Sequence, residues 1–387
     1  MSGERFISRK LRFRGGVTVA SVAVSFLVMI LAVCISAGFR SSIRSGVRSI
    51  IGDVRIMPQA YNFSGEAVPM TVPLPSGEDI LSIPGVASME PVVERAGIVR
   101  NGDIIHGVLV KGCSQAPDSS LCVSIPERLS AITGLGVGDD MPTYFVGDKV
   151  KVRKFHITAV HRDIMEMDNN LLVYAPLEDM RRLQGWDENQ ASAVDITLSP
   201  AVTADAAVNE ISSHIGSIII NSPHSEEEDL VTFSSIHRYT QVFDWLRLLD
   251  FNVVVILILM TVVAGFNMLA GVLIHLLRNI PVIGTLKTMG MADKSIVSVF
   301  LRVSSRAVLL GMAIGNALAL LFCAVQGSTH LIKLDPANYF VSFVPVHINL
   351  PLIIGADIIA YLAMMAMLML SVKFISRVDP ALTVKAD

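Results

Sequence analysis

The sequence lacks the common motifs of nucleotide binding and hydrolysis. No G-x-x-x-x-G-K-[ST] occurs, and the nearest string, Gly290-Met-Ala-Asp-Lys294-Ser295, has neither the spacing nor the second glycine of a phosphate-binding loop. No G-x-S-x-G, H-E-x-x-H or paired-carboxylate constellation is present either. We therefore expect a chain that is not an enzyme and holds no cofactor or metal itself. We also expect no nucleic-acid partner.

Cysteine is scarce, with four residues in the 387 of the chain. Cys34 and Cys323 fall in long apolar runs, where a buried thiol behaves as a small apolar side chain. Cys113 and Cys122 flank the short loop SQAPDSSL, whose length and turn-forming residues suit a disulfide in an oxidising compartment. We predict this disulfide, and two free thiols are the alternative.

Charged residues are also scarce, at 17% of the chain against roughly 25% in an average soluble domain. They are almost missing from four runs, 17–38, 251–277, 307–329 and 348–372, in which Asp357 is the only acidic or basic side chain apart from a histidine. A helix needs about 20 apolar residues to cross a bilayer, whereas a run of about 10–14 is typical of a buried core helix. The sequence therefore predicts four transmembrane helices. The first run is too long for a signal peptide and precedes no small-residue cleavage site, so we expect it to be retained.

The flanking charges predict the orientation. Five Lys/Arg and one acid precede the first run, and five Lys/Arg and one acid lie between the second and third runs. The positive-inside rule places both segments and the C-terminal tail in the cytoplasm. Segment 40–250 then lies outside, and it carries 17 Lys/Arg and 28 Asp/Glu, a net charge of −11 that the −3 of the whole chain conceals.

The external segment alternates between short strands and short helices. Asn101-Gly102 predicts a hairpin turn between two strands. Mixed strands and helices over this length predict one α+β domain, inserted between the first and second helices of an integral membrane α-helical protein. Strands are expected at 53–57, 96–99, 104–110, 149–155, 156–160, 170–174 and 193–198, and helices at 177–183 and 204–214.

The expected layout assigns a role to each part of the chain. The first segment is basic and interleaved with apolar residues, as in helices that lie along a membrane surface. The parts are a cytoplasmic amphipathic segment 1–16, transmembrane helices 17–38, 251–277, 303–327 and 351–375, an external domain with stalk helices 39–250, a cytoplasmic coupling loop 278–302, an external loop 328–350 and a cytoplasmic tail 376–387.

Two stalk helices are expected to join the spans to the external domain. The first stalk helix continues the first span, and its arginines share one face. We expect this face to contact solvent or lipid headgroups. Contact with an acidic partner surface is the alternative. The second is expected to begin at Ser225, which forms a capping box with Glu228. The arginines are Arg40, Arg44 and Arg48. The apolar residues expected to pack between the stalks and to border a substrate path are Ile43, Val47, Ile50, Tyr239, Phe243 and Leu246.

Polar and small residues are rare within the spans. Asn267 is expected to form a hydrogen bond between helices. Gly311 and Gly315 form a G-x-x-x-G, which permits close packing of two helices within one chain or across a dimer. Asp357 is expected near the outer end of the fourth span, at the membrane interface, with a proton-relay role as the alternative.

The loop between the second and third spans is basic and half apolar. A loop that only reverses the chain does not need apolar residues such as Ile283, Leu286 and Met289. With no nucleotide-binding motif in the chain, this composition predicts a coupling segment that binds a separate cytoplasmic protein and transmits force from it.

The chain resembles the ABC permeases of the FtsX/MacB superfamily, and within it the LolC/LolE subunits of lipoprotein-releasing systems. The resemblance rests on the run 243–274 followed by IGTLKTMGMADKSIVSVFL at 283–301, and on the order of one span, a large domain and three spans. Further matches are GLGVGD at 134–139, YFVSFVP at 339–345 and VDPAL at 378–382.

This resemblance implies a partner and a contact. A cytoplasmic ATPase dimer, which binds the ATP and magnesium, would dock on two permease subunits and pass its closure through the stalks. One family feature, an acidic residue and an arginine ahead of the Ile-Gly motif, is replaced here by Arg278-Asn-Ile-Pro281-Val282, so apolar residues would supply most of the contact. The docking residues implied are Pro281, Ile283, Gly284, Leu286, Lys287, Met289, Gly290 and Met291.

The main hypothesis is a permease subunit that extracts lipoproteins from the inner membrane of a diderm bacterium. Its expected partners are the ATPase dimer, a second permease copy or paralogue, the lipoprotein cargo and inner-membrane lipids. A periplasmic carrier is a further partner, although the segment 141–155 is short for the hairpin that recruits it in one subunit of the lipoprotein system. The alternatives are an export or tripartite-pump permease for peptides or small amphiphiles, and an FtsX-like regulator of a cell-wall hydrolase.

Overall fold

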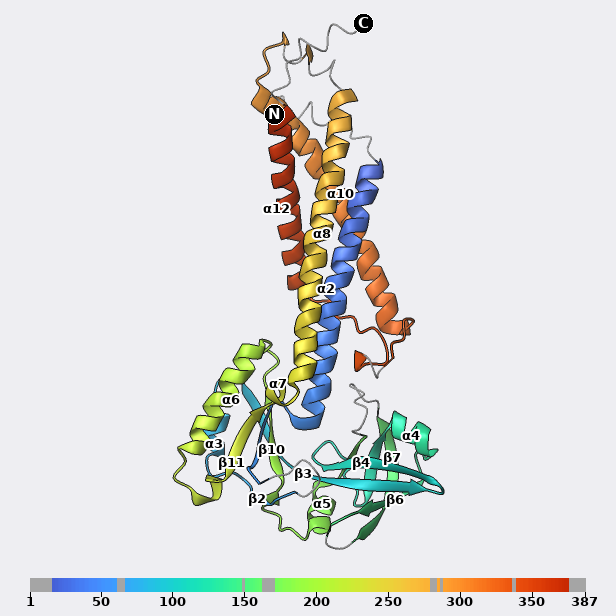
Figure 1. The fold of residues 1–387 in the computed structure, drawn as a ribbon, viewed down its shortest axis with the longest axis vertical. Coiled ribbons are helices and arrows are strands. Elements are labelled where there is room, and N and C mark those ends of the chain that lie inside the picture. The colour runs from blue at the N-terminus through green and yellow to red at the C-terminus, as the bar shows by residue number, and fades with distance from the viewer. Residues whose placement is uncertain are drawn as a thin grey trace. The chain divides into compact units, whose positions relative to one another are not determined.

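The computed structural model describes residues 16–60, 67–147, 150–161, 171–278, 284–285, 288–335 and 339–375. The chain divides into two compact units (Figure 1). The helical unit takes its described residues from Met1–Ser41, Leu246–Lys333 and Phe343–Asp387. The external unit takes them from Ser42–Trp245 and Leu334–Ser342. Two long helices run from one unit into the other.

Within the described residues, four helices are long and apolar enough to cross a membrane. They confirm the four predicted spans. Helices α2 and α8 are longer than a bilayer needs, because both extend into the external unit. The helices are α2 (Gly16–Ile51), α8 (Thr240–Arg278), α10 (Asp293–Thr329) and α12 (Leu350–Ile375).

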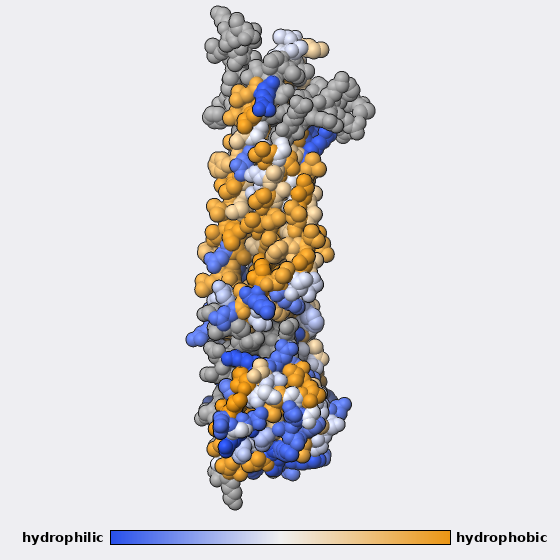
Figure 2. Space-filling view, turned by 90° about the vertical axis from the view of Figure 1, so that its right-hand side faces the viewer, coloured by the Kyte–Doolittle hydropathy of each residue, from blue (hydrophilic) through white to orange (hydrophobic). Residues whose placement is uncertain are grey.

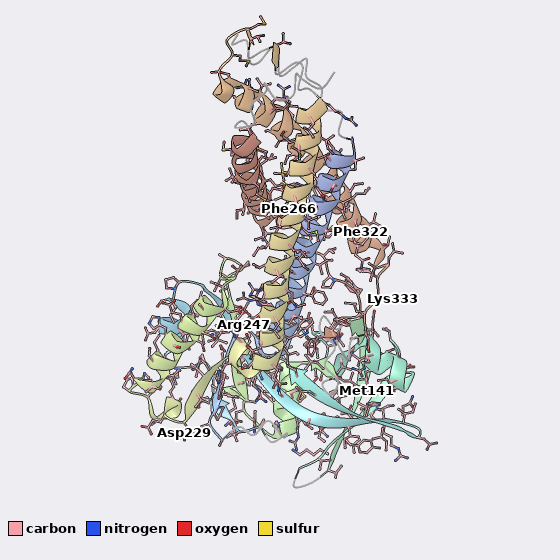
Figure 3. All side chains as sticks on the ribbon, turned by 45° about the horizontal axis from the view of Figure 1, so that its top comes forward. Met141, Asp229, Arg247, Phe266, Phe322 and Lys333 are labelled. Carbon is pink, nitrogen blue, oxygen red and sulfur yellow. The ribbon has the colours of Figure 1, made fainter. Side chains whose placement is uncertain are left out.

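The core of the helical unit is made by all four helices. Phe26 from α2, Met268 from α8, Val308 from α10 and Met364 from α12 belong to one buried apolar cluster. Many other apolar side chains of these helices stay exposed, among them Phe266 and Phe322 in Figure 3, and Figure 2 shows a broad hydrophobic surface over the helices. A surface of this kind suits contact with lipid or another membrane subunit, because water would not solvate it favourably.

Small residues set the distance between α10 and α2. A methyl group on Gly311 would meet the Val22 side chain, with Cγ1 at 2.7 Å, and one on Gly315 would meet the Ala23 carbonyl oxygen at 2.5 Å. Both contacts are shorter than real carbon contacts allow, so glycine is required at each position. The predicted close packing at Gly311 and Gly315 is confirmed, and it occurs within one chain.

Asn267 bridges two helices of the same unit. Its side-chain amide donates a hydrogen bond to the Ser21 hydroxyl of α2. The predicted interhelical hydrogen bond is therefore present, between the second and first spans.

The external unit is organised by one nine-stranded sheet, in the order β11-β1-β10-β3-β4-β8-β5-β7-β6, with β3 also paired to β6. A two-stranded sheet joins β2 to β9. The strands are β1 (Val54–Pro58), β2 (Met70–Thr71), β3 (Val86–Asn101), β4 (Ile104–Gly112), β5 (Cys122–Pro126), β6 (Asp140–Phe145), β7 (Lys151–His161), β8 (Leu172–Ala175), β9 (Gln190–Ala191), β10 (Ala193–Leu198) and β11 (Leu230–Ser234).

The long strand β3 connects two halves of this sheet. Its residues from Val86 to Val92 pair with β10, and those from Val93 to Asn101 pair with β4. The β3–β6 pairing closes β3, β4, β8, β5, β7 and β6 into a ring, which leaves β10, β1 and β11 as an open extension. Both halves therefore share a single strand, and β1, which directly follows α2, lies in the open half.

Short helices complete the external unit. They are α3 (Gly77–Leu81), α4 (Glu127–Thr133), α5 (Leu177–Gln184), α6 (Asp205–Ile220), the 3-10 helix η1 (Ser225–Glu227) and α7 (Ser235–Arg238). The predicted strands and helices are present, as is the hairpin at Asn101-Gly102. The two strands expected at 149–155 and 156–160 are a single strand, β7.

The second stalk helix begins later than predicted. Ser225 starts only the three residues of η1, and the chain then forms β11 before it turns helical. The true capping residue is Ser234, whose hydroxyl accepts a hydrogen bond from the His237 backbone N–H at the start of α7. Glu227 is buried and accepts hydrogen bonds from the Ser76 N–H and hydroxyl instead. Pairing of β11 with β1 thus overrides the local capping signal.

The predicted disulfide is wrong, because Cys113 and Cys122 are both free thiols. Cys113 follows β4, Cys122 starts β5, and β8 lies between these strands in the sheet. Strands two places apart are separated by about 10 Å, whereas a disulfide needs Cα atoms about 4.4–6.8 Å apart. The Cys113 side chain packs in an apolar cluster with Met57 and Val92.

Candidate functional site: the joint at the end of the first helix

The C-terminus of α2 enters the external sheet through a one-residue turn. Gly52 has φ +69°, and its N–H donates to the Arg48 carbonyl oxygen at 2.8 Å, which ends the helix in the left-handed conformation common at helix C-termini. A methyl group at this position would lie 2.9 Å from the Ile196 carbonyl oxygen, so no larger residue fits. Only Asp53 then separates the turn from β1.

Arg55, in β1, is the centre of a buried ionic cluster. Its side chain is 2% exposed, and its guanidinium donates two hydrogen bonds to Glu94 on β3 and two to Asp195 on β10, at 2.6–2.9 Å. Burial alone would lower the pKa of Arg55, but the two carboxylates outweigh it and raise that pKa well above its ordinary value. One side chain therefore joins three strands.

The same cluster holds the end of α2. Lys111 on β4 donates to the Ser49 and Ile50 carbonyl oxygens at 3.3 and 2.8 Å and to Asp195 at 2.7 Å. Arg55 also donates to the Ile50 carbonyl oxygen at 3.1 Å. The last carbonyls of a helix lack partners within the helix and carry partial negative charge, so two cations stabilise them. Burial would raise the pKa of Asp195, but Arg55 and Lys111 lower it.

Asp53 adds a second attachment just beyond the helix. Its side chain is 1% exposed, accepts a hydrogen bond from the Leu198 N–H at 2.8 Å and forms an ion pair with Arg48 of α2 at 2.8 Å. Arg44 of α2 donates to the Val202 carbonyl oxygen at 2.9 Å. The last turns of α2 are thus tied to β10 and to the segment after it.

The second long helix attaches at the same place. Strand β11 pairs with β1, and the Ser235 N–H donates to the Asp53 carbonyl oxygen at 2.9 Å. The chain then passes through α7 to Tyr239 and α8. Burial raises the pKa of Tyr239, so this phenol stays neutral. The entry of α2 and the exit towards α8 are therefore adjacent on β1.

We call Asp53, Arg55, Glu94, Lys111 and Asp195 the stalk joint. It contains two cationic and three anionic side chains, and the third anion is matched by Arg48. A buried ionic cluster with its hydrogen bonds satisfied holds its members in one geometry, because parting any pair would leave a buried charge without a partner. The cluster therefore ties the last turn of α2 to β1, β3, β4 and β10.

Sequence analysis missed the stalk joint. Arg55 and Asp195 each lie within a strand between two apolar residues, and this alternation normally places the charge on a solvated face. Glu94 and Lys111 also lie within strands and follow valines. The available signal was the pairing of unlike charges across neighbouring strands: Arg55 is opposite Asp195, and Glu94 is opposite Lys111. That signal needs the strand order, which the sequence does not provide.

The apolar stalk residues are buried as predicted. Ile43, Val47 and Ile50 of α2 are at most 8% exposed, and Phe243 and Leu246 of α8 are both 3% exposed. Tyr239, the sixth, is half-buried and precedes α8. Their role along a substrate path stays a prediction.

The expected solvation of the arginine face is wrong. Arg40 forms an ion pair with Asp250 of α8 at 2.9 Å, next to a 2.6 Å hydrogen bond from Ser36 to the same carboxylate. Arg48 is paired with Asp53, and Arg44 with carbonyl oxygens. The face thus serves contacts within the chain.

The coupling segment is only partly described. Pro281, Ile283, Leu286 and Lys287 lie outside the described residues. The Met289 N–H donates to the Thr285 carbonyl oxygen at 3.1 Å, and the Met289 side chain is 80% exposed. Gly290 has φ +84°, which suits the end of a helical turn, and Met291 and Ala292 lead into α10. Gly284 has open space around its Cα.

No group of three or more His, Cys, Asp or Glu side chains among the described residues is arranged to hold a metal ion. Two long helices reach neighbouring strands of the external sheet: α2 leads into β1, and β11, which pairs with β1, leads through α7 into α8.

The model for the MacB-like periplasmic core domain matches residues 16–214, more than half of the chain, and the model for the FtsX-like permease C-terminal region matches residues 254–380. The chain belongs to the FtsX/MacB family of ABC permease subunits. A permease of this family implies an ABC ATPase as its partner. It is a multi-pass membrane protein whose external unit is an extracytoplasmic MacB-like domain.

This permease is also similar to solved extracytoplasmic domains. The periplasmic region of MacB from Actinobacillus actinomycetemcomitans is 13% identical, with 50% of this chain and 95% of that one covered and a TM-score of 0.31. The extracellular domain of the noncanonic ABC-type transporter YknZ from Gram-positive bacteria is 9% identical. The match covers 47% of this chain and 99% of that domain, with a TM-score of 0.31. Comparison with curated proteins finds no match.

Proposed function

We propose that this permease subunit extracts lipoproteins from the inner membrane of a diderm bacterium, using ATP that a separate cytoplasmic ATPase dimer hydrolyses. The subunit itself has no catalytic role. It works with a second permease subunit, and both of its termini lie in the cytoplasm.

The observation that carries the proposal is the continuity of α2. This helix has 36 residues without a break, from Gly16 inside the helical unit to Ile51 at the stalk joint. A helix rises about 1.5 Å per residue, so α2 is about 54 Å long, which exceeds the roughly 30 Å of a hydrocarbon core. The part of α2 beyond the hydrocarbon core would carry movement out of the membrane. The buried ions of the stalk joint would transmit this movement to the sheet.

In this proposal, the ATPase acts on the permease at the coupling segment. Met289 presents a largely exposed apolar side chain beside the turn at Gly290, as a docking residue should. The proposed ATPase contact comprises Pro281, Ile283, Gly284, Leu286, Lys287, Met289, Gly290 and Met291. Closure of the ATPase would move this segment and, through it, α8 and α10, whose ends flank it.

Lipoprotein is the cargo that best fits a mechanical subunit with a large external domain. A lipoprotein has acyl chains in the outer leaflet and a polypeptide outside, so its release needs work at the membrane surface and not a path through the membrane. The sequence matches to lipoprotein-releasing permeases at 243–301 and 339–345 support this choice.

The test is reconstitution of the purified permease complex, with its co-purifying ATPase, in proteoliposomes that contain a radiolabelled triacylated lipoprotein. We expect ATP-dependent release of the lipoprotein into detergent-free buffer that contains a soluble lipoprotein carrier. A control lipoprotein whose lipid anchor has been replaced by a transmembrane helix should stay in the membrane. ATP-dependent movement of a peptide or amphiphile with no lipoprotein release, or activation of a cell-wall hydrolase with no cargo at all, would overturn the proposal.

A further inference from the structure

A carboxyl and an amide join α10 to α12 inside the helical unit. The Asn316 side-chain N–H donates a hydrogen bond to Oδ2 of Asp357. Asp357 is only 9% exposed. Its position near the outer membrane interface stays a prediction. The remaining oxygens of the two groups, Asn316 Oδ1 and Asp357 Oδ1, are both buried, and neither has a hydrogen-bond partner.

The surroundings supply no compensating charge. On α12, Asp357 follows Ile353 and Ala356, which pack in an apolar cluster with residues of α2 and α10. The runs 17–38, 251–274 and 307–329 of the other three helices contain no Lys, Arg, Asp or Glu. The other titratable groups on these faces are the Cys34 and Cys323 thiols of the same cluster, and Tyr361, one turn further on α12, which pairs with the Ser305 hydroxyl at 2.7 Å.

An ionised carboxylate is poorly accommodated in this place. It would bury a full charge against one neutral donor, which is unfavourable in an apolar medium. It would also leave the buried Oδ1 atoms of both groups without a hydrogen-bond donor. A single proton removes both problems, because a carboxylic acid is a donor as well as an acceptor.

We propose that Asp357 holds a proton and donates it, from Oδ1, in a hydrogen bond to Oδ1 of Asn316. This bond and the existing bond from Asn316 Nδ2 to Asp357 Oδ2 close a ring between an acid and an amide. All four polar atoms then have partners, and the pair of side chains carries no net charge. The ligand of this site is the proton.

The site links proton binding to the packing of two helices. While α10 and α12 stay in contact, the pair retains its proton. If the helices part and water reaches Asp357, the acid becomes free to ionise, so the packed state binds one proton more than the parted state. By linkage, a lower pH favours the packed state and a higher pH favours the parted state.

Infrared spectroscopy of the full-length protein in lipid nanodiscs tests the proposal directly. The difference spectrum between the parent protein and Asp357→Asn at neutral pH should contain the C=O band of a protonated carboxylic acid. The matched control, Asp335→Asn, changes a carboxyl in the loop after α10 and should remove a carboxylate band instead. Asn316→Leu should shift the acid band to the frequency of a carboxyl without hydrogen bonds.

Chemical labelling gives a second readout. Dicyclohexylcarbodiimide reacts with protonated carboxyls in apolar surroundings, so peptide mass spectrometry should find the adduct on Asp357 and lose it in Asp357→Asn. If that variant does not fold, Asp357→Glu retains the acid and should keep the adduct. Loss of a carboxylate band in Asp357→Asn, or protection from the carbodiimide by sodium ions at constant pH, would overturn the proposal in favour of an ionised carboxylate that binds a cation.

Discussion

Replacement of Arg55 by methionine tests whether the stalk joint holds the external domain together. Methionine has a similar length and fills the same space, but it removes the charge and the donors. Glu94 and Asp195 would each lose the two hydrogen bonds that Arg55 donates to them, while Lys111 would still pair with Asp195. The buried cluster would lose one of its two cations.

The size of the effect follows from the five hydrogen bonds that Arg55 donates, four to carboxylates and one to the end of α2. Removal of one partner from a buried ion pair typically lowers the free energy of unfolding by about 3–5 kcal/mol. In a domain of this size class, each kcal/mol lowers Tm by about 2–4 °C, so the expected loss for Arg55→Met is about 6–20 °C.

The assay is thermal unfolding of the full-length protein in detergent, with hydrogen exchange read by mass spectrometry to locate the change. We expect faster exchange in β1, β3 and β10, and in the last turn of α2. Arg182→Met is the matched control, since the Arg182 side chain is 73% exposed and its nearest carboxylate is 3.9 Å away. The control should stay within about 0.5 kcal/mol of the parent protein.

An Arg55→Met protein as stable as Arg182→Met, with unchanged exchange in β1, would refute the reasoning. The ionic cluster would then contribute no more than an apolar residue of the same volume, which is a known outcome when a whole buried ion pair is replaced. To separate the two cases, the double variant Arg55→Met, Glu94→Leu, which keeps the pair of Lys111 and Asp195, should recover part of the stability that Arg55→Met loses.

Two further predictions concern the thiols and the helix contacts. Mass spectrometry without reductant should find both external cysteines as free thiols, with Cys122 labelled faster because burial raises the pKa of Cys113 and keeps it protonated; a linked peptide pair would contradict the structure. Gly315→Val should lower the thermal stability of the helical unit by about 1–3 kcal/mol, because the added carbons meet the Ala23 carbonyl oxygen. Gly355→Val, at an open position on α12, should change it much less, and equal losses would contradict close packing at Gly315.

The parts of this fold that depend on local properties were predictable from the sequence. Length and apolar composition are sufficient to predict the four spans, and Asn101-Gly102 is sufficient to predict the hairpin, because each signal depends only on residues close together in the sequence. The small residues Gly311 and Gly315 likewise predicted close packing, although the partner helix, α2, emerged only in the structure.

The parts that depend on pairing between distant segments were not predictable. Ser225 and Ser234 both carry a capping hydroxyl, and only the pairing of β11 with β1 shows which of them starts a helix. Cys113 and Cys122 are close in sequence, yet β8 lies between their strands in the sheet. Strand β8 begins fifty residues after Cys122. Arg55 was overlooked for the same reason, since its two carboxylates come from strands that are remote in sequence.

The buried pair of Asn316 and Asp357 belongs to this second group. The sequence showed an acid in the fourth span, but not the amide of the third span that accompanies it. The burial of Asp357 between two helices therefore could not be judged from its distance to the end of the run.

A proline in the middle of α2 tests most directly whether this helix transmits movement to the external domain. Ser41 is exposed and lies within the unbroken helix, so Ser41→Pro removes a helix hydrogen bond and kinks α2 without disturbing a buried contact. In the reconstituted complex, we predict that Ser41→Pro leaves ATPase binding and ATP hydrolysis in place but abolishes cargo release, while Ser41→Ala behaves as the parent protein. Cargo release by an intact Ser41→Pro complex at the parent rate would contradict the account.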